Sequence, residues 1–172
     1  MRSRSQAGFT LIELLIVVAI IGIIAAIAIP SLLRARIAAN EAGAIGDTRA
    51  VVSSEHAYAA SNGSNYGQIS CLATPPLCGW SAGTTPFLDA QIGALVTKQG
   101  YVRSFLPGVL GTGSPDPGLL TFVYFATPAA VSSTGNRGFG GDNSGVICQT
   151  NTGVLPATTA GASLAPTCTP LK

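Results

Sequence analysis

The chain contains few charged residues. Only 9% of its 172 residues are Asp, Glu, Lys or Arg, and it has one histidine and one tryptophan. Acid–base, nucleophilic and metal chemistry depend on such side chains, and neither a phosphate-binding G-x-x-x-x-G-K-[ST] nor an H-E-x-x-H pattern occurs in the sequence. The sequence therefore predicts a protein that is not an enzyme and that has no cofactor and no metal site.

A large net charge is also lacking. The formal charge is +2, and it is accounted for by Arg2 and Arg4 near the N-terminus, because the remaining acidic and basic side chains balance. A chain without a basic excess has no electrostatic preference for nucleic acid from its net charge. We therefore predict no direct nucleic-acid partner.

Four cysteines are present, and all follow residue 70. Their spacings, C-x6-C and C-x19-C, do not match zinc sites. An even number of cysteines in an exported region indicates two disulfides, for which three pairings are possible. We favour Cys71–Cys78 with Cys148–Cys168, because each bridge closes a local loop that contains Pro or Gly.

One long apolar run stands out near the N-terminus. It extends from Phe9 to Ile29, interrupted by a single acid, Glu13, and follows a short basic leader. As a helix it would be about 31 Å long, which matches a hydrocarbon core of about 30 Å. By the positive-inside rule the leader stays in the cytoplasm and the remainder of the chain lies outside.

Three interpretations of this run compete. It is a secretory signal peptide cut after Ala28, a plain membrane anchor, or a retained segment whose leader is removed before it. Glu13 weighs against the first two, because a charge in a membrane helix costs up to about 2.5–3.5 kcal/mol and neither role gains from it.

The pattern downstream also weighs against a cut at Ala28. Apolar and partly apolar positions recur at three- and four-residue spacings, which predicts an amphipathic helix over residues 31–60. The recurring positions are Ile37, Ile45, Thr48, Val51, Val52, Glu55 and Tyr58. Pro30 kinks a helix without having to end it, so one helix from Phe9 to about Ala60 is expected.

The order Gly8-Phe9-Thr10-Leu11-Ile12-Glu13, apolar run and Pro30 resembles the N-terminus of type IV pilins and of the pseudopilins of type II secretion. The resemblance covers about 25 residues. It implies that a prepilin peptidase cuts between Gly8 and Phe9, leaving residues 1–8 as the leader, and methylates the new amine of Phe9. It also implies that the retained helix (9–30) first anchors the subunit in the inner membrane and then packs in a filament core.

The resemblance assigns an assembly role to Phe9, Glu13, Gly22 and Pro30. The Glu13 carboxylate is expected to meet the Phe9 amine of a neighbouring subunit and so set the register of assembly. Gly22 and Pro30 weaken the helix between them, so this stretch either loses helicity when the filament is stretched or carries a static kink.

The remainder, residues 31–172, is expected to form an α+β extracytoplasmic domain. The amphipathic helix leads into a variable loop (61–118) with a short helix over 91–100. A sheet and a disulfide-closed tail (119–172) follow. The expected strands are 119–127, 136–139 and 145–150, with a turn at 140–143. The strand at 119–127 is apolar on both faces, so both faces should be covered. The tail after Val154 is expected to be irregular and held through Cys168.

These features favour a pilin precursor that polymerises into a surface filament for adhesion, motility or DNA uptake. The partners would be further copies of the chain, the inner membrane, the prepilin peptidase and an assembly platform. One alternative is a pseudopilin, which would stay in the periplasm. The other is a secreted or anchored binding domain that never polymerises.

Overall fold

The computed structural model describes residues 8–171, which belong to two compact units divided between Arg36 and Ile37. One helix, α1 (Leu11–Ser61), runs through both units. The single long helix expected from the sequence is therefore confirmed, although it begins at Leu11 rather than at Phe9. The combination of this helix with an antiparallel sheet confirms the predicted α+β, pilin-like class.

In the second unit, α1 buries one face. The buried residues recur at helical spacing and are Glu41, Ala44, Thr48, Val51, Val52, Glu55, Tyr58 and Ala59. Three of them are polar, and the Thr48 hydroxyl is satisfied within the helix by donating to the Ala44 carbonyl at 2.8 Å. The two glutamates need partners from elsewhere in the fold, because a buried acid is costly when it is unpaired.

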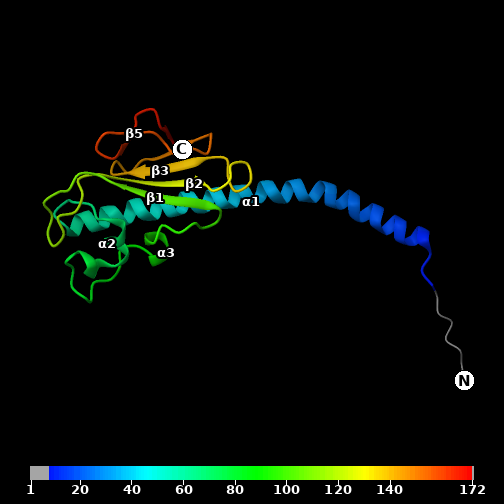
Figure 1. Ribbon diagram of the computed structural model, residues 1–172, viewed down its shortest axis with the longest axis horizontal. Helices are drawn as coiled ribbons and strands as arrows, with labels where there is room; N and C mark the ends of the chain where they lie inside the picture. Colours follow the sequence, from blue (N-terminus) through cyan, green and yellow to red (C-terminus); the bar gives the residue numbers. More distant parts are fainter. Residues whose placement is uncertain (1–7, 172) are drawn as a thin grey trace, which may run out of the picture. The chain divides into compact units, whose positions relative to one another are not determined.

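An antiparallel sheet of five strands packs against this part of α1 (Figure 1). Its strands, in spatial order, are β1 (Tyr101–Pro107), β2 (Phe122–Pro128), β3 (Gly138–Asp142), β4 (Ile147–Thr150) and β7 (Thr169–Pro170). The first four form a meander. The core between helix and sheet contains Val51 and Tyr58 from α1 and Tyr124 and Phe139 from the sheet.

Both faces of β2 are covered, as its sequence predicts. Tyr124 belongs to the core shared with α1, whereas Val123 and Phe125 form a second cluster with Ala162 and Leu164. The residues that cover the outer face come from a small hairpin, β5 (Thr158–Thr159) and β6 (Ser163–Leu164). The expected strand at 119–127 thus exists, with bounds shifted to Phe122–Pro128.

The predicted turn at 140–143 is wrong, because Gly140, Gly141 and Asp142 lie in β3. Gly140 and Gly141 allow close packing instead of forming a turn. A Cβ atom on Gly141 would lie 2.7 Å from Cγ2 of Val52 and 3.0 Å from Cγ2 of Thr48, so β3 approaches α1 more closely than a larger residue allows.

The loop over 61–118 holds more regular structure than the sequence predicts. It contains α2 (Ile69–Ala73), a 3-10 turn at Pro75–Cys78, α3 (Ala90–Gly93) and the whole of β1. The expected helix over 91–100 is limited to α3, whose first turn is capped by the Asp89 carboxylate accepting from the Gln91 N–H at 2.9 Å. Strand β1 was not expected, because its neighbourhood is rich in turn-forming residues.

The tail is held differently from expectation. After β4 it forms the β5–β6 hairpin and then β7, which pairs with β4 through Cys148–Pro170 and Gln149–Thr169. The Leu171 N–H also donates to the Ile147 carbonyl at 2.7 Å. Backbone pairing therefore holds the tail, whereas the sequence suggested a covalent bridge.

Candidate functional site

The N-terminal segment of the first unit is organised by a reciprocal contact between Thr10 and Glu13. The Glu13 carboxylate oxygen Oε2 accepts from the Thr10 N–H at 2.9 Å and from the Thr10 hydroxyl at 2.6 Å. The Glu13 N–H donates to the same hydroxyl at 3.3 Å. This is a capping box, in which Thr10 satisfies a free N–H of the first helical turn and Glu13 returns the contact.

This contact between Glu13 and Thr10 was not predicted. The signal was present, since Thr-x-x-Glu before an apolar run is the sequence pattern of a capping box. Both side-chain contacts use Oε2 of Glu13, and within residues 8–171 its other oxygen, Oε1, makes no hydrogen bond. The carboxylate can therefore cap its own helix and still accept a second donor.

Gly8 and Phe9 lie before the first helical residue and are solvent-exposed. A Cβ on Gly8 would have no atom within 4 Å, and Phe9 is 85% exposed. A peptide bond in non-helical, exposed chain is accessible to a peptidase. Residues 1–7 of the expected leader lie outside the described residues.

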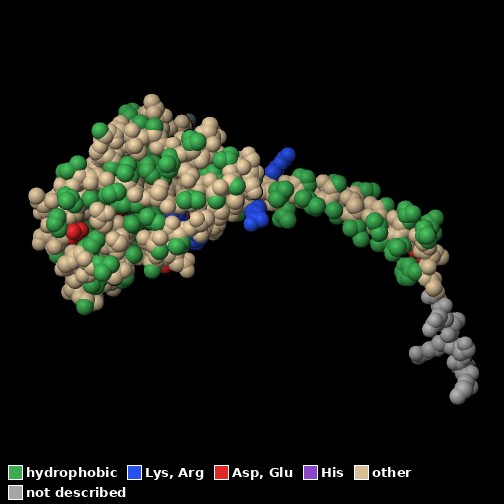
Figure 2. Space-filling view, viewed as in Figure 1, with side chains coloured by type: hydrophobic (Ala, Val, Ile, Leu, Met, Phe, Trp, Pro, Cys, Tyr) green, Lys and Arg blue, Asp and Glu red, His purple; other side chains and the backbone are tan. Residues whose placement is uncertain are grey.

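The helix in the first unit is apolar on all sides. Its large side chains are each about half exposed or more, and its most apolar 18-residue window buries none of its residues. Figure 2 shows these hydrophobic side chains covering the helix surface. A helix with this composition is buried either in lipid or among other helices.

Gly22 and Pro30 both lie inside α1, which is helical throughout this stretch. No atom lies within 4 Å of a Cβ built on Gly22, so no close approach within the described chain requires glycine there. Pro30 has no N–H to donate to the carbonyl one turn before it. Loss of helicity between these residues stays a prediction.

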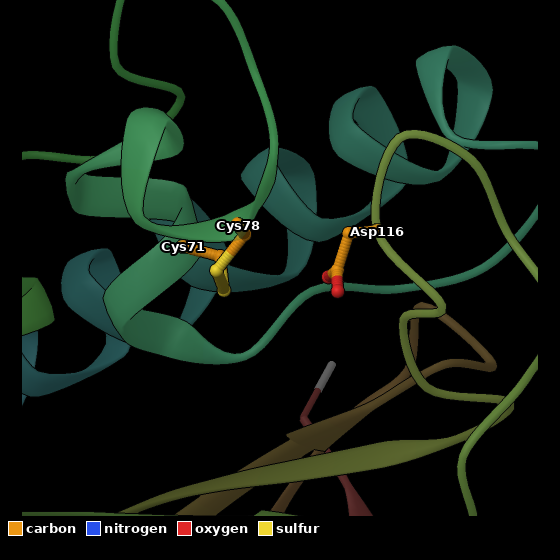
Figure 3. A group of neighbouring side chains, drawn as sticks. All are labelled: Cys71, Cys78 and Asp116. Atoms are coloured by element: carbon orange, nitrogen blue, oxygen red, sulfur yellow. A yellow bond between two sulfur atoms is a disulfide. The ribbon is translucent and has the colours of Figure 1, made fainter.

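The first predicted disulfide, Cys71–Cys78, is present and joins α2 to the following 3-10 turn. The carboxylate of Asp116 lies beside its sulfur atoms, within 4.8 Å (Figure 3). Both sulfurs are bonded to each other, so neither offers a thiolate to a metal ion. Asp116 instead accepts from the Tyr58 hydroxyl at 2.9 Å, and that hydroxyl accepts from the Trp80 Nε1–H at 3.0 Å.

The second predicted disulfide is absent from the structure, where Cys148 and Cys168 are free thiols. Burial and hydrogen bonding to Cys168 raise the pKa of the Cys148 thiol to about 12. Cys148 lies on β4, and the tail that carries Cys168 is already held to β4 through β7. The segment between Cys148 and Cys168 is therefore closed by strand pairing and not by a disulfide.

Residues 79–83 read Gly-Trp-Ser-Ala-Gly and match the G-x-S-x-G pattern of serine hydrolases, which sequence analysis overlooked. The structural context of that pattern is a strand, a sharp turn and a helix. Here Ser81 follows a 3-10 turn, is exposed, and hydrogen-bonds with the Thr84 hydroxyl at 3.0 Å. His56, the single histidine, lies on α1 with its ring against Tyr66. Ser81 and the residues around it therefore lack the arrangement of a serine hydrolase site.

Two acids of α1, Glu41 and Asp47, form ion pairs with the rest of the second unit, and these pairs were not expected. Glu41 accepts from the backbone N–H groups of Asn136 and Arg137 at 2.9 and 3.2 Å and pairs with the Arg137 guanidinium at 2.7 Å. Arg103, on β1, is buried and pairs with Asp47. In each pair the acid and the arginine lie far apart in the sequence, so no local spacing predicts the pair.

Comparison with known proteins places the similarity at the N-terminus. Residues 3–29 match the model of the prokaryotic N-terminal methylation motif. A segment of 38 residues is 66% identical to the type IV wide pilus major component PilA4 of Thermus thermophilus, and it covers 22% of this chain and 29% of that relative. The match thus spans less than a third of the relative's length. No solved structure matches the chain.

The similarity coincides with the segment that carries the predicted cleavage site, the capping box and the exposed apolar helix. In the second unit, the fold and the Cys71–Cys78 disulfide are those expected of a pilin-like domain. By its N-terminal methylation motif and its α+β architecture, this chain is similar to type IV pilin-like and pseudopilin subunits.

Proposed function

We propose that this chain is the precursor of a structural subunit of a type IV pilus, and that its role is assembly rather than catalysis. The observation that carries the proposal is the apolar first-unit helix, which overlaps a methylation motif at residues 3–29 that includes an exposed Gly8–Phe9 junction. Such a helix suits two successive environments, a membrane and a bundle of identical helices. The similarity to a pilus component supports the same role.

In this proposal a prepilin peptidase removes residues 1–8 and the new Phe9 amine is methylated. Until assembly, the helix holds the subunit in the inner membrane with the second unit on the outer side. An assembly platform then adds subunits to a filament that reaches the cell surface. If the chain is a pseudopilin, the filament stays in the periplasm.

Glu13 supplies the register of assembly. Removing one charge from water without a partner costs several kcal/mol, and pairing recovers much of that cost. The positive Phe9 amine of a neighbouring subunit is a suitable partner for Glu13. Because Oε2 is engaged by Thr10 in the capping box, Oε1 is the oxygen that remains for the neighbour. A subunit that stops short of this contact leaves both charges unpaired.

Gly22 and Pro30 supply flexibility to the same helix. Pro30 removes one backbone hydrogen bond, and glycine is a poor helix former. We propose that the helix between them can unwind when the filament is under tension. Amide hydrogen exchange over residues 22–30 should then be faster in assembled filaments than over the helical turns on either side.

The test begins with the N-terminus of the mature protein. Mass spectrometry should find a chain that starts at methylated Phe9, and shearing should release surface filaments that contain it. A start at Ile29 would contradict every filament role and favour a secreted domain. Retention in the cell envelope, together with a block in protein export when the chain is deleted, would favour the pseudopilin role.

A further inference from the structure

Glu55 is the most enclosed acid of the second unit. It lies on α1 with 0% of its surface exposed. Its Oε2 atom accepts a hydrogen bond from the Gly67 N–H at 2.9 Å, whereas no group of residues 8–171 donates to its buried Oε1 atom. A buried carboxylate normally has a cation or several donors, so this environment does not suit a negative charge.

The other enclosed acids of this unit are compensated. Glu41 has the Arg137 guanidinium and two backbone donors. Asp142 uses both oxygens, accepting from Ser144 and from the Leu164 N–H at 2.8 Å. In the described part of the chain no ion pair includes Glu55.

The groups that face Glu55 do not supply positive charge. Tyr58 on α1 and Tyr66 on the following loop lie near Glu55. Burial is the main cause of the raised pKa of each phenol, and a Glu55 charge raises it further. Asp142, on β3, adds a further negative charge near Tyr66. His56 lies on α1 with its ring edge against Tyr66 rather than in a bond to Glu55.

The contact made by Glu55 joins three parts of the fold. Gly67 follows Tyr66, whose backbone pairs with Leu119 through bonds of 2.8 and 2.6 Å just before β2. A Cβ on Gly67 would lie 3.1 Å from the Tyr58 ring, so this backbone is pressed against α1. The Glu55–Gly67 bond therefore attaches the loop that borders the sheet to the helix.

We propose that Glu55 is held as a neutral carboxylic acid in the folded protein and acts as a pH-responsive latch between α1 and the Tyr66–Gly67 segment. Loss of the proton to water leaves a negative charge in a fully buried site, where no group of residues 8–171 donates to Oε1. The charge is stabilised when the loop moves away and water enters, so deprotonation opens the latch.

Burial raises the pKa of Glu55 from about 4.5 to about 8, and the Gly67 hydrogen bond offsets only part of this shift. Between these two values the folded state holds one proton more than the unfolded state. The stabilisation is fully present below pH 4.5, decreases as pH rises, and is lost above about pH 8. The equilibrium constant for unfolding should rise roughly tenfold per pH unit across this window.

The experiment uses the full chain in detergent micelles. The carboxyl carbon of Glu55 is followed by NMR from pH 4 to pH 10, and urea unfolding of the second unit is measured over the same range. Glu55→Gln removes the titration and keeps the acceptor for Gly67. Asp89→Asn is the matched control, because Asp89 is exposed and Asn caps a helix equally well.

We expect Glu55 to titrate far above 4.5, and Glu55→Gln to remove the Glu55 contribution to the pH dependence while Asp89→Asn retains it. The protection factor of the Gly67 amide should fall through the same midpoint, whereas that of β2 amides should not. Titration of Glu55 near 4.5, or a Glu55→Gln protein with an unchanged pH slope, overturns the proposal. If Glu55→Gln does not fold, the titration of the unaltered protein decides. Filament assembly does not enter any of these measurements.

Discussion

The Arg137 guanidinium lies 2.7 Å from the Glu41 carboxylate and connects the loop between β2 and β3 to α1. Glu41 is buried, whereas the Arg137 side chain is 36% exposed. The Arg137 guanidinium also lies over the ring of Phe139, 5.4 Å from its centroid. The pair is therefore partly buried and connects α1 to the sheet, unlike a surface salt bridge.

Arg137→Met should destabilise the second unit, because it leaves the buried Glu41 carboxylate without its cation. Breaking a fully buried pair costs about 3–5 kcal/mol, and solvent at Arg137 reduces this to roughly 1–3 kcal/mol. Urea unfolding measures the difference. Lys98→Met is the control: Lys98 lies 3.6 Å from Asp47 and is 38% exposed, and Asp47 keeps Arg103. A larger loss for Lys98→Met than for Arg137→Met would contradict the assignment.

Gly141→Ala should destabilise the same unit by about 1–3 kcal/mol, because the new methyl group would overlap Val52 and force β3 away from α1. Gly46→Ala is the matched control in α1, since no atom lies within 4 Å of its added Cβ. That change should stabilise the helix by up to about 1 kcal/mol. Thermal unfolding of both variants checks the prediction, and equal effects of the same sign would exclude close packing as the role of Gly141.

Glu13→Gln separates the charge of Glu13 from its capping role. The amide oxygen can still accept from Thr10, so membrane insertion and cleavage should be unchanged, but filaments should be scarce because the charge for the neighbouring Phe9 amine is gone. Glu13→Ala should insert, be cleaved and assemble equally poorly.

Thr10→Ala provides the control, since it removes the cap and keeps the charge. It should weaken the first helical turn by about 0.5–2 kcal/mol and leave assembly largely intact. Quantifying sheared filaments distinguishes the two variants. Normal filaments from Glu13→Gln would show that charge pairing is not needed.

The four cysteines should differ in reactivity. Alkylation of the folded, unreduced protein at neutral pH should modify Cys168 before Cys148, because Cys148 is buried and its raised pKa keeps it protonated. Cys71 and Cys78 should react only after reduction. Mass mapping of labelled peptides checks the order. Absence of labelling at both Cys148 and Cys168 before reduction would mean that they are oxidised in the isolated protein.

Local patterns were enough for the helix and, with shifted bounds, for three strands, since the expected strands at 136–139 and 145–150 overlap β3 and β4. The apolar run and the three- and four-residue spacing predict α1 over nearly its whole length, and the apolar stretch at 119–127 predicts β2. The capping box at Thr10 and Glu13 is also local and could have been found. The Cys71–Cys78 bridge follows from a short spacing, because a short loop brings the two sulfurs close in any compact fold.

Other features depend on contacts between distant segments. Gly140 and Gly141 look like turn residues in the sequence, but in the structure both permit close packing. A Cβ on Gly141 would meet Val52 of α1, and a Cβ on Gly140 would lie 3.0 Å from Cδ2 of Leu164 in the tail. From its sequence the tail was expected to need a disulfide, but in the structure the pairing of β7 with β4 holds it.

An apolar helix, an N-terminal methylation motif and an α+β unit can be predicted from the sequence, because these depend on composition and on spacing within a few residues. The electrostatics of the buried acids depend on tertiary contacts. Glu41 pairs with Arg137, whereas the one donor to Glu55 among the described residues is the Gly67 N–H, although both acids lie on the same face of the same helix. The difference comes from the strands and loops that fold onto each position, and the free energy of a buried charge depends on those neighbours rather than on adjacent residues.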